Sequence, residues 1–209
     1  ALGVPAPAPN FNVAPGSQAQ FITAKHPNQT DPQQDHSNQL NLGYWSFLME
    51  PHPNNPNKLR PNPSYKTFNA QSHRLTSSPL WQQAYRQQRC IVPMSGFYEW
   101  NKGQCHYITP EHGKAFAMAG LYTQFTKGPQ TAFAFSIITL PPQDEFCHIH
   151  DKSYPFALLP NEYEQWLDNS NYQPDTYQQW MDAGIRQGIQ IEAVNKPFEP
   201  NQQQSLFTL

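Results

Sequence analysis

Prolines punctuate this chain from end to end, and they set the scale of its secondary structure. The 209 residues include 22 prolines, whereas charged residues make up only 13% of the chain. Proline fixes φ and lacks the amide hydrogen that a helix interior or an inner strand needs, so long uninterrupted elements are disfavoured. The sequence therefore predicts many short elements joined by turns, rather than a bundle of long helices.

Short apolar runs with strand character recur along the whole chain, and they predict about eight or more strands. Three short helices are predicted at residues 77–89, 161–168 and 176–184. Residues 50–64 carry so many Pro and Asn residues that we expect a long loop there. We predict one α+β domain spanning residues 1–209, with mainly antiparallel strands in a curved, barrel-like sheet and a few short helices.

The cysteines and the apolar stretches exclude several classes of protein. Cys90, Cys105 and Cys147 form no CxxC pair, which disfavours a disulfide framework or a zinc ribbon and fits a reducing, cytoplasmic compartment. The longest apolar stretches are too short to span a membrane. We predict no membrane association and no cofactor.

Positive charge is concentrated in the middle of the chain. No Asp or Glu occurs between Glu50 and Glu99. That window holds the cations Lys58, Arg60, Lys66, Arg74, Arg86 and Arg89, beside His52 and His73. Such a region can attract phosphates locally although the net charge is −2. The alternative is chance clustering in a chain with few charges.

Glu99 stands between two large aromatic residues in a predicted strand. Strand alternation places Phe97 and Glu99 on one face, and Tyr98 and Trp100 on the other. A carboxyl group on an apolar face has a raised pKa, which suits general acid or base chemistry. The alternative is an exposed glutamate of an ordinary strand.

The segment from Cys147 to Asp151 is the second candidate. His148 and His150 share one face of a predicted strand, as a zinc-binding pair does, but no second ligand cluster follows, so we predict no metal site. His150 beside Asp151 suits an acid/base group or a phosphate donor, and the alternative is a polar turn. A Cys–His peptidase using Cys90 or Cys147 lacks a recognisable nucleophile motif.

Seven segments follow one another in a particular order: Asn12–Pro15, Asn69–His73, Pro79–Trp81, Arg89–Trp100, Phe116–Leu121, Ile137–Thr139 and Ile149–Lys152. In this order, and over nearly the whole chain, they resemble the SRAP family of SOS-response-associated peptidases, also called abasic-site processing proteins. The block Arg89–Trp100 is the most specific of them.

The resemblance implies a protein that binds single-stranded DNA and captures abasic sites. In the family, an N-terminal cysteine supplies an α-amine, which forms a Schiff base with the ring-opened sugar, and a thiol, which closes it to a thiazolidine. An α-amine is substantially neutral near pH ~8, and a thiolate is a strong nucleophile. The resemblance assigns Glu99 and His150 to acid/base roles and Asn69 to positioning the abasic site.

The same resemblance and the basic middle of the chain imply a set of DNA contacts, made to phosphates or by stacking. The residues concerned are Asn12, Pro15, Trp45, Gln71, Arg74, Arg89, Trp100, Thr139 and Lys152. The expected partner is single-stranded DNA with abasic sites. The expected protein is a monomer in the cytoplasm that becomes nucleoid-associated when it is on DNA.

Three positions depart from the family pattern. The family's Met-Cys-Gly-Arg start is absent, because the sequence begins at Ala1, and we expect the cysteine to lie upstream of it. His73 replaces an acidic residue, and Lys152 replaces an arginine, which loses bidentate phosphate geometry but keeps a point charge.

Two alternatives to the abasic-site processing enzyme stay open. One is a non-covalent module for single-stranded DNA or junctions that has lost the nucleophile. The other is a hydrolase or lyase that uses Glu99 and His150 on a substrate other than DNA. The peptidase label of the family would refer to processing of the protein's own N-terminus, and the predicted enzyme class is hydrolase or lyase.

Overall fold

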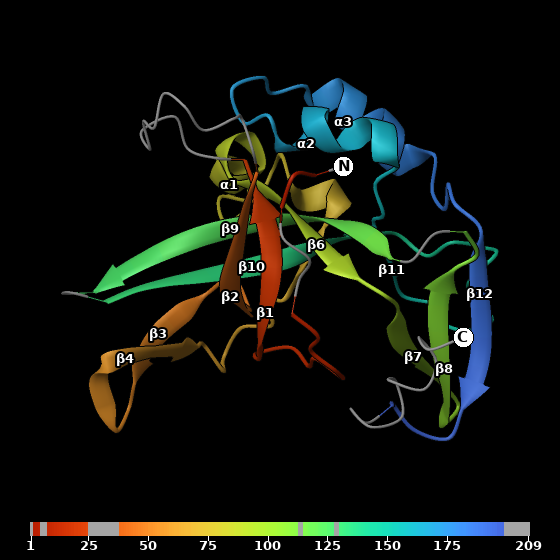
Figure 1. Ribbon diagram of the computed structural model, residues 1–209, viewed down its shortest axis with the longest axis horizontal. Helices are drawn as coiled ribbons and strands as arrows, with labels where there is room; N and C mark the ends of the chain where they lie inside the picture. The colour runs from red at the N-terminus through yellow and green to blue at the C-terminus, as the bar shows by residue number, and fades with distance from the viewer. Residues whose placement is uncertain (1, 5–7, 25–37, 113–114, 128–129, 199–209) are drawn as a thin grey trace.

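A closed five-stranded barrel forms the centre of the protein (Figure 1). The computed structural model describes residues 2–4, 8–24, 38–112, 115–127 and 130–198. The barrel strands are β1 (Gln18–Thr23), β2 (Gln39–Trp45), β6 (Arg89–Met94), β9 (Phe116–Lys127) and β10 (Gln130–Leu140). They pair in the order β10–β2–β1–β6–β9, and β9 closes the ring by pairing with β10. This confirms the predicted α+β fold with a barrel-like sheet.

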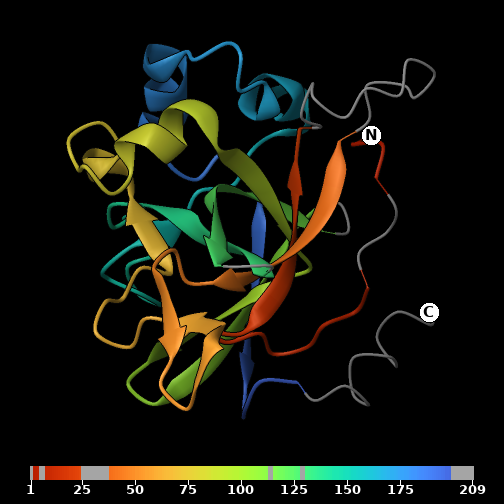
Figure 2. The same ribbon diagram turned by 90° about the vertical axis from the view of Figure 1, so that its left-hand side faces the viewer.

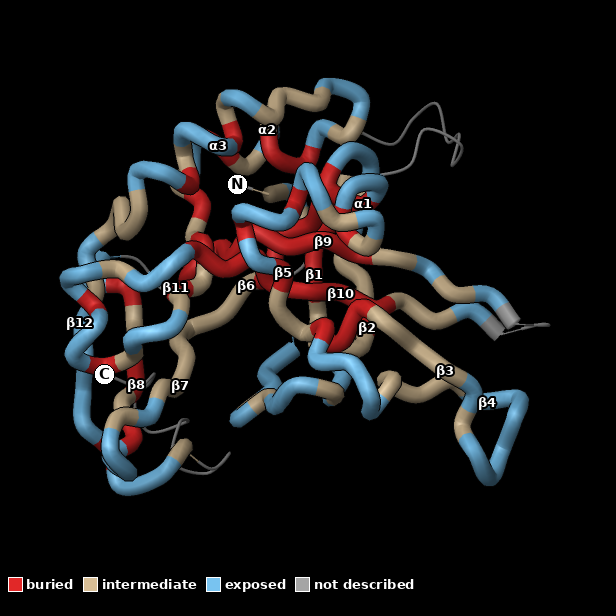
Figure 3. Tube along the Cα trace, turned by 180° about the vertical axis from the view of Figure 1, so that it is seen from behind, coloured by how far each residue is buried: buried red, intermediate tan, exposed pale blue. Residues whose placement is uncertain are grey.

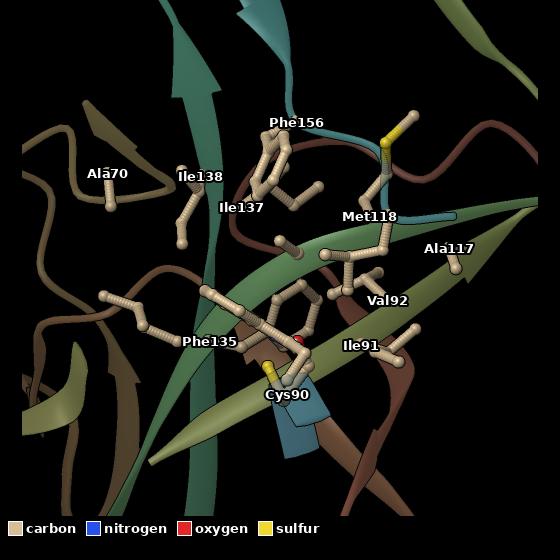
Figure 4. Packing of buried hydrophobic residues seen from close by; sticks show 14 of the residues in the cluster. Ala70, Cys90, Ile91, Val92, Ala117, Met118, Phe135, Ile137, Ile138 and Phe156 are labelled. Atoms are coloured by element: carbon tan, nitrogen blue, oxygen red, sulfur yellow. The ribbon is translucent and has the colours of Figure 1, made fainter. Parts of the chain in front are cut away.

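Long buried runs of mainly apolar residues make the long barrel strands. In β10, every residue from Ala134 to Leu140 is buried, and in β9 the run Ala117–Tyr122 is buried as well. A strand reads as an unbroken apolar run when both of its faces are covered. Figure 3 shows this buried core beneath the helices, and Figure 4 shows side chains from β6, β9 and β10 gathered within it.

Three short helices cover one side of the barrel, as Figures 1 and 2 show. They are α1 (Gln82–Gln87), α2 (Tyr163–Leu167) and α3 (Pro174–Asp182). The 3₁₀ turns η1 (Ser72–Arg74) and η2 (Pro160–Glu162) precede α1 and α2. The three helices overlap the predicted segments, but α1 is shorter than predicted because residues 78–81 form a turn closed on the Ser78 carbonyl.

Two further sheets flank the barrel in the described part of the chain. One consists of β7 (Phe97–Asn101), β8 (Gln104–Pro110) and β12 (Ile189–Val194), in the order β12–β8–β7. The other pairs β3 (Met49–His52) with β4 (Asn55–Pro61). The short strands β5 (Asn69–Gln71) and β11 (Tyr154–Pro155) both pair with β10.

The structure corrects two of the predicted local structures. Residues 50–64, predicted as a loop, contain the β3–β4 hairpin, in which prolines are tolerated because both strands are edges. Glu50 lies opposite Arg60 in that hairpin, and the two form an ion pair of 2.6 Å. Residues 148–160, predicted as a strand broken by a turn, begin with a turn and bends, and strand structure begins only at Tyr154.

A buried arginine joins the helices to the barrel. Arg89, the first residue of β6, has no exposed surface, and its guanidinium donates four hydrogen bonds to backbone carbonyls. The acceptors lie at the ends of α1 and α2 and are the carbonyls of Tyr85, Arg86, Trp166 and Asp168, at 2.6–2.9 Å. Carbonyls at a helix C-terminus carry partial negative charge, so they compensate the buried cation.

Arg89→Ala should destabilise the fold strongly, because it leaves several buried carbonyls without donors. We expect a loss of about 3–5 kcal/mol in the free energy of unfolding, measured by urea denaturation. Arg86→Ala is the matched control, because the Arg86 side chain is exposed. A loss for Arg89→Ala no larger than that of the control would contradict this role.

Candidate active site

The β7–β8 hairpin carries the candidate acid/base residue. Lys102 and Gly103 form its two-residue turn, with φ of 49° and 85°. Positive φ at both central residues is typical of the type I′ turn, which fixes the register of the flanking strands. Asn101 therefore pairs with Gln104, and the ladder continues until Phe97 pairs with Ile108.

Gly96 lets the chain pass from the barrel into this hairpin. A Cβ atom at Gly96 would lie 2.6 Å from the Ile108 carbonyl oxygen and 2.6 Å from the Tyr107 ring. Real Cβ atoms do not approach other atoms so closely, so a side chain here would push β7 away from β8. Glycine at this position therefore helps to set where the following strand, and Glu99 within it, can lie.

Glu99 and His150 form a pair at this site. The Nδ1 atom of His150 lies 3.1 Å from the Oε2 atom of Glu99, and the two side chains are 22% and 24% exposed, respectively. His150 comes from the turn region between β10 and β11, 51 positions further along the chain. The contact uses Nδ1 and leaves Nε2, the other ring nitrogen, outside the pair, while the carboxylate orients the imidazole.

An apolar wall lies beside Glu99. Phe97, two residues earlier on the same face of β7, contacts Phe116, Phe146 and Tyr154, with ring centroids 5.8–6.3 Å apart. Tyr98, on the opposite face, contacts Tyr107 instead. These contacts agree with the alternation predicted from the sequence. The candidate carboxyl therefore stands next to a packed aromatic cluster rather than in open solvent.

Burial raises the pKa of Glu99 above that of a free glutamate, while the positive charge of His150 and a hydrogen bond from the Trp100 backbone oppose this shift. The desolvation effect is the largest of the three, so the net direction is upward. A carboxyl of this kind exchanges protons closer to neutral pH than an exposed one does, which suits general acid or base chemistry.

The sequence reasoning missed a third polar residue on this face, His106 of β8. It is the direct register partner of Glu99, and partners opposite each other in an antiparallel pair share a face. Its Nδ1 atom is buried without a hydrogen-bond partner. The two-residue turn at Lys102–Gly103 already fixes the pairing of residue 99 with residue 106, so the sequence carried a signal for this neighbour.

Asn69 and Gln71 lie on β5, beside the C-terminal end of β10. Asn69 pairs with Ile137 and is partly buried, whereas Gln71 is exposed and pairs with Thr139. Thr139 pairs on its other side with Pro155 of β11. In the part of the chain that the structure describes, no hydrogen bond joins Asn69 to the Glu99–His150 pair, so its predicted positioning role stays a prediction.

The N-terminal turn and Trp45 form a separate group. Asn12 and Pro15 are exposed, and Asn12 has a φ of 51°. Backbone hydrogen bonds of 2.9 Å join Gly16 and Ser17 to Trp45. The Trp45 indole donates to the Phe68 carbonyl at 2.8 Å, directly before Asn69. Trp45 therefore ties the N-terminal turn to the start of β5.

Two residues predicted to contact DNA, Arg89 and Thr139, are buried in the structure, which corrects that prediction. Arg89 has no exposed surface, and its guanidinium is occupied by backbone carbonyls, so it has nothing to offer a phosphate. Thr139 is 5% exposed and lies between β5 and β11. Arg89 was predicted at the surface because charged residues are mostly exposed. In the structure, carbonyl groups at the ends of two helices supply buried partners for its guanidinium.

Three other predicted contacts lie at the surface. Arg74 is exposed on η1, directly after β5, and Lys152 is exposed two residues after His150. Trp100 is 52% exposed, but it lies on the face of β7 opposite Glu99, in contact with Tyr98.

The described residues offer no site for a metal ion, because no group of three or more His, Cys, Asp or Glu side chains gathers among them. Within the same residues, no helix is long and apolar enough to cross a membrane.

Sequence comparison matches residues 3–199 to the family model described as SOS response associated peptidase (SRAP). Curated relatives include the abasic site processing proteins YoaM of Bacillus subtilis, 30% identical over 143 residues, and YMR114C of Saccharomyces cerevisiae, 31% identical over 111 residues. These matches cover 64% and 50% of this chain, and 63% and 29% of the relatives. The chain thus spans less than two thirds of the length of these relatives.

Solved structures share the fold at lower identity. A crystal structure of a Bordetella bronchiseptica protein aligns with a TM-score of 0.66 and 17% identity, covering 90% of each chain. A phage-related protein of the same organism aligns with a TM-score of 0.62 and 21% identity, covering 91% of this chain and 84% of its own. These likenesses concern the fold alone.

The stability of the Glu99→Gln variant relative to the wild type should increase as the pH rises. The pKa of Glu99 is higher in the folded chain than in the unfolded one, so wild-type stability is lost as the pH rises from about 4.3, the unfolded value, through the folded pKa. The glutamine side chain does not ionise, so the Glu99→Gln variant escapes this loss. Urea denaturation at pH 4, 5.5 and 7 should show the variant gaining on the wild type with pH.

Glu192→Gln is the matched control for this measurement, because Glu192 is an exposed glutamate of β12 in the same sheet. A Glu99→Gln variant that loses stability relative to the wild type as the pH rises would contradict a net upward shift of the Glu99 pKa.

Proposed function

The chain belongs to the SOS response associated peptidase (SRAP) family, and from that membership we propose that the protein binds single-stranded DNA and processes abasic sites. The relatives with 30–31% identity are named as abasic site processing proteins, which supports this substrate class. The observation that carries the proposal is the contact of 3.1 Å between Glu99 and His150, two residues that the family pattern assigns to acid/base roles.

The proposed chemistry is capture of the ring-opened abasic sugar by an α-amine and a thiol. The amine nitrogen attacks the aldehyde carbon to form a carbinolamine, which loses water to give an imine, and the thiol sulfur then adds to the imine carbon to close a thiazolidine. The net reaction joins aldehyde, amine and thiol with release of one water. One proton must be delivered to the departing hydroxyl, and others must be removed from nitrogen and sulfur.

Glu99 and His150 suit these proton transfers. The partly desolvated carboxyl of Glu99 can hold a proton and give it to the departing hydroxyl. His150 is oriented by its contact with Glu99, and it can accept or donate a proton through its other ring nitrogen during opening of the sugar ring.

The cysteines of the described chain are poor candidates for the thiol. Cys90 and Cys105 are buried, and burial raises the pKa of both thiols. Cys147 is exposed and donates to the Asp144 carbonyl. We therefore assign the amine and thiol to an N-terminal cysteine of the full-length protein, as in the family pattern.

The crosslink test uses full-length protein and single-stranded DNA with one abasic site, followed by a denaturing gel. The wild type should leave a band of retained DNA, and Glu99→Gln and His150→Gln should form it about 10²- to 10⁴-fold more slowly, the usual contribution of a positioned acid or base. Glu192→Gln and His148→Gln are matched controls, because both replace exposed residues of the same type.

Other outcomes of this test favour other functions. Reversible binding without a crosslink would support a non-covalent DNA-binding module. Failure to bind single-stranded DNA at low salt would overturn both of these functions and favour a substrate other than DNA. A crosslink formed at the wild-type rate by Glu99→Gln would remove Glu99 from the mechanism.

Arg74 is the surface cation that we propose for a phosphate contact. It is exposed on η1, and the described structure gives it no ion pair. A phosphate contact releases counterions, so Arg74→Ala should flatten the plot of log affinity against log salt by about 0.7 on single-stranded DNA. Arg60→Ala makes the same change in net charge, but Arg60 is paired with Glu50. Equal slopes for the two variants would place Arg74 away from the DNA.

A further inference from the structure

His106 faces Glu99 from the neighbouring strand. The two residues are register partners in the antiparallel β7–β8 pair, so their side chains leave the sheet on the same face. Cβ atoms of such partners are about 4.5–5.5 Å apart. At this separation, a carboxyl and an imidazole can come into hydrogen-bond contact by a change of side-chain torsion, without movement of the backbone.

The ring of His106 presents an unsatisfied nitrogen. Its Nδ1 atom is buried and has no hydrogen-bond partner, although the residue as a whole is only partly buried. Buried polar atoms normally have a partner, so this exception requires a physical explanation. A neutral imidazole with its proton on Nε2 leaves Nδ1 as an acceptor. Such an acceptor calls for a donor on the same face of the hairpin.

Glu99 can supply that donor when it is protonated. Burial favours the neutral form of its carboxyl, and a neutral carboxyl has one O–H to donate. Oε2 of Glu99 already contacts Nδ1 of His150, which can donate to it. A protonated Glu99 carboxyl therefore accepts at one oxygen and needs an acceptor for the O–H of the other. An acceptor on the opposite strand would complete the hydrogen bonding of the acid form.

We propose that His106 is a second histidine partner of Glu99. The Nδ1 atom of His106 accepts a hydrogen bond from the protonated carboxyl of Glu99 and holds that carboxyl in its acid form. This role rests on the proposed function only for its use in catalysis. His106 acts through Glu99 and is therefore a positioning residue.

The other titratable groups near this face act on Glu99 in different ways. His150 contributes the attraction of a cation when it is protonated, and this favours the carboxylate. Asp151 and Lys152, which follow it, are exposed. Tyr154 borders the apolar wall, and its hydroxyl, also buried without a hydrogen-bond partner among the described residues, stays protonated and uncharged because burial raises its pKa to about 12.

The two histidines therefore act on Glu99 in opposite directions. Contact with protonated His150 stabilises the carboxylate, and contact with His106 stabilises the carboxylic acid. A carboxyl held between them can serve as an acid in one step and as a base in another. Imine formation followed by ring closure requires both.

Carboxyl titration of the DNA-free full-length protein by NMR, with ¹³C-labelled glutamate, tests this inference. His106→Leu keeps the bulk of the ring and removes the acceptor, so it should lower the pKa of Glu99. His106→Asn places an amide oxygen near the position of Nδ1, so it should keep the pKa of Glu99 near the wild-type value. Backbone amide spectra of both variants report whether the hairpin has kept its structure.

Space filling alone would give the reverse pattern, with His106→Leu behaving as the wild type and His106→Asn shifted, and that result overturns the proposal. An unchanged pKa of Glu99 in both variants overturns it as well. In the crosslinking assay, His106→Leu should be slower by up to about tenfold, the equivalent of one hydrogen bond, and His106→Asn should restore the rate.

The titration and the crosslinking assay test the two proposals independently. A wild type that forms no crosslink defeats the proposed function, while the titration in the absence of DNA still decides the partnership of His106 with Glu99. A wild type that forms the crosslink, with both His106 variants titrating alike, defeats only the partnership.

Discussion

One buried guanidinium links the barrel to its helical cover. Arg89 is the first residue of β6, and its four hydrogen bonds hold the carbonyl ends of α1 and α2 against that strand. Its ring contacts reinforce the arrangement, since the guanidinium carbon lies 5.0 Å from the centroid of the Tyr177 ring in α3. β6 then runs through Gly96 into β7, so the strand that carries Glu99 continues from the strand that Arg89 anchors.

The candidate site follows from short-range rules applied to this frame. A type I′ turn sets the register of the hairpin, glycine allows its close approach, and an aromatic wall removes water from one side of Glu99. His150 reaches the same place from a turn region held by hydrogen bonds of Ile149 and His150 to the Phe146 carbonyl. The local fold thus brings together a carboxyl, an imidazole and an apolar surface, which are the components that an acid/base site requires.

Much of this arrangement could be predicted from the sequence. Apolar runs, turn signals and strand alternation predicted the barrel-like sheet, the three helical segments and the face on which Glu99 lies. The β3–β4 hairpin was missed, because prolines at edge strands resemble loop prolines in a sequence. Arg89 was misplaced at the surface, because its partners include carbonyls at a helix end 77–79 positions away, and their placement depends on the whole fold. His106 was recoverable from the two-residue turn, but it became evident only with the register.

The central claim is that Glu99 and His150 work as one acid/base unit on abasic DNA. A double-mutant cycle on the rate of crosslink formation tests it most directly, using wild type, Glu99→Gln, His150→Gln and the double variant. Residues that act as a unit are strongly non-additive, so the double variant should be about as slow as the slower single variant. Rate losses that multiply in the double variant would contradict the account, because they would show two residues acting independently.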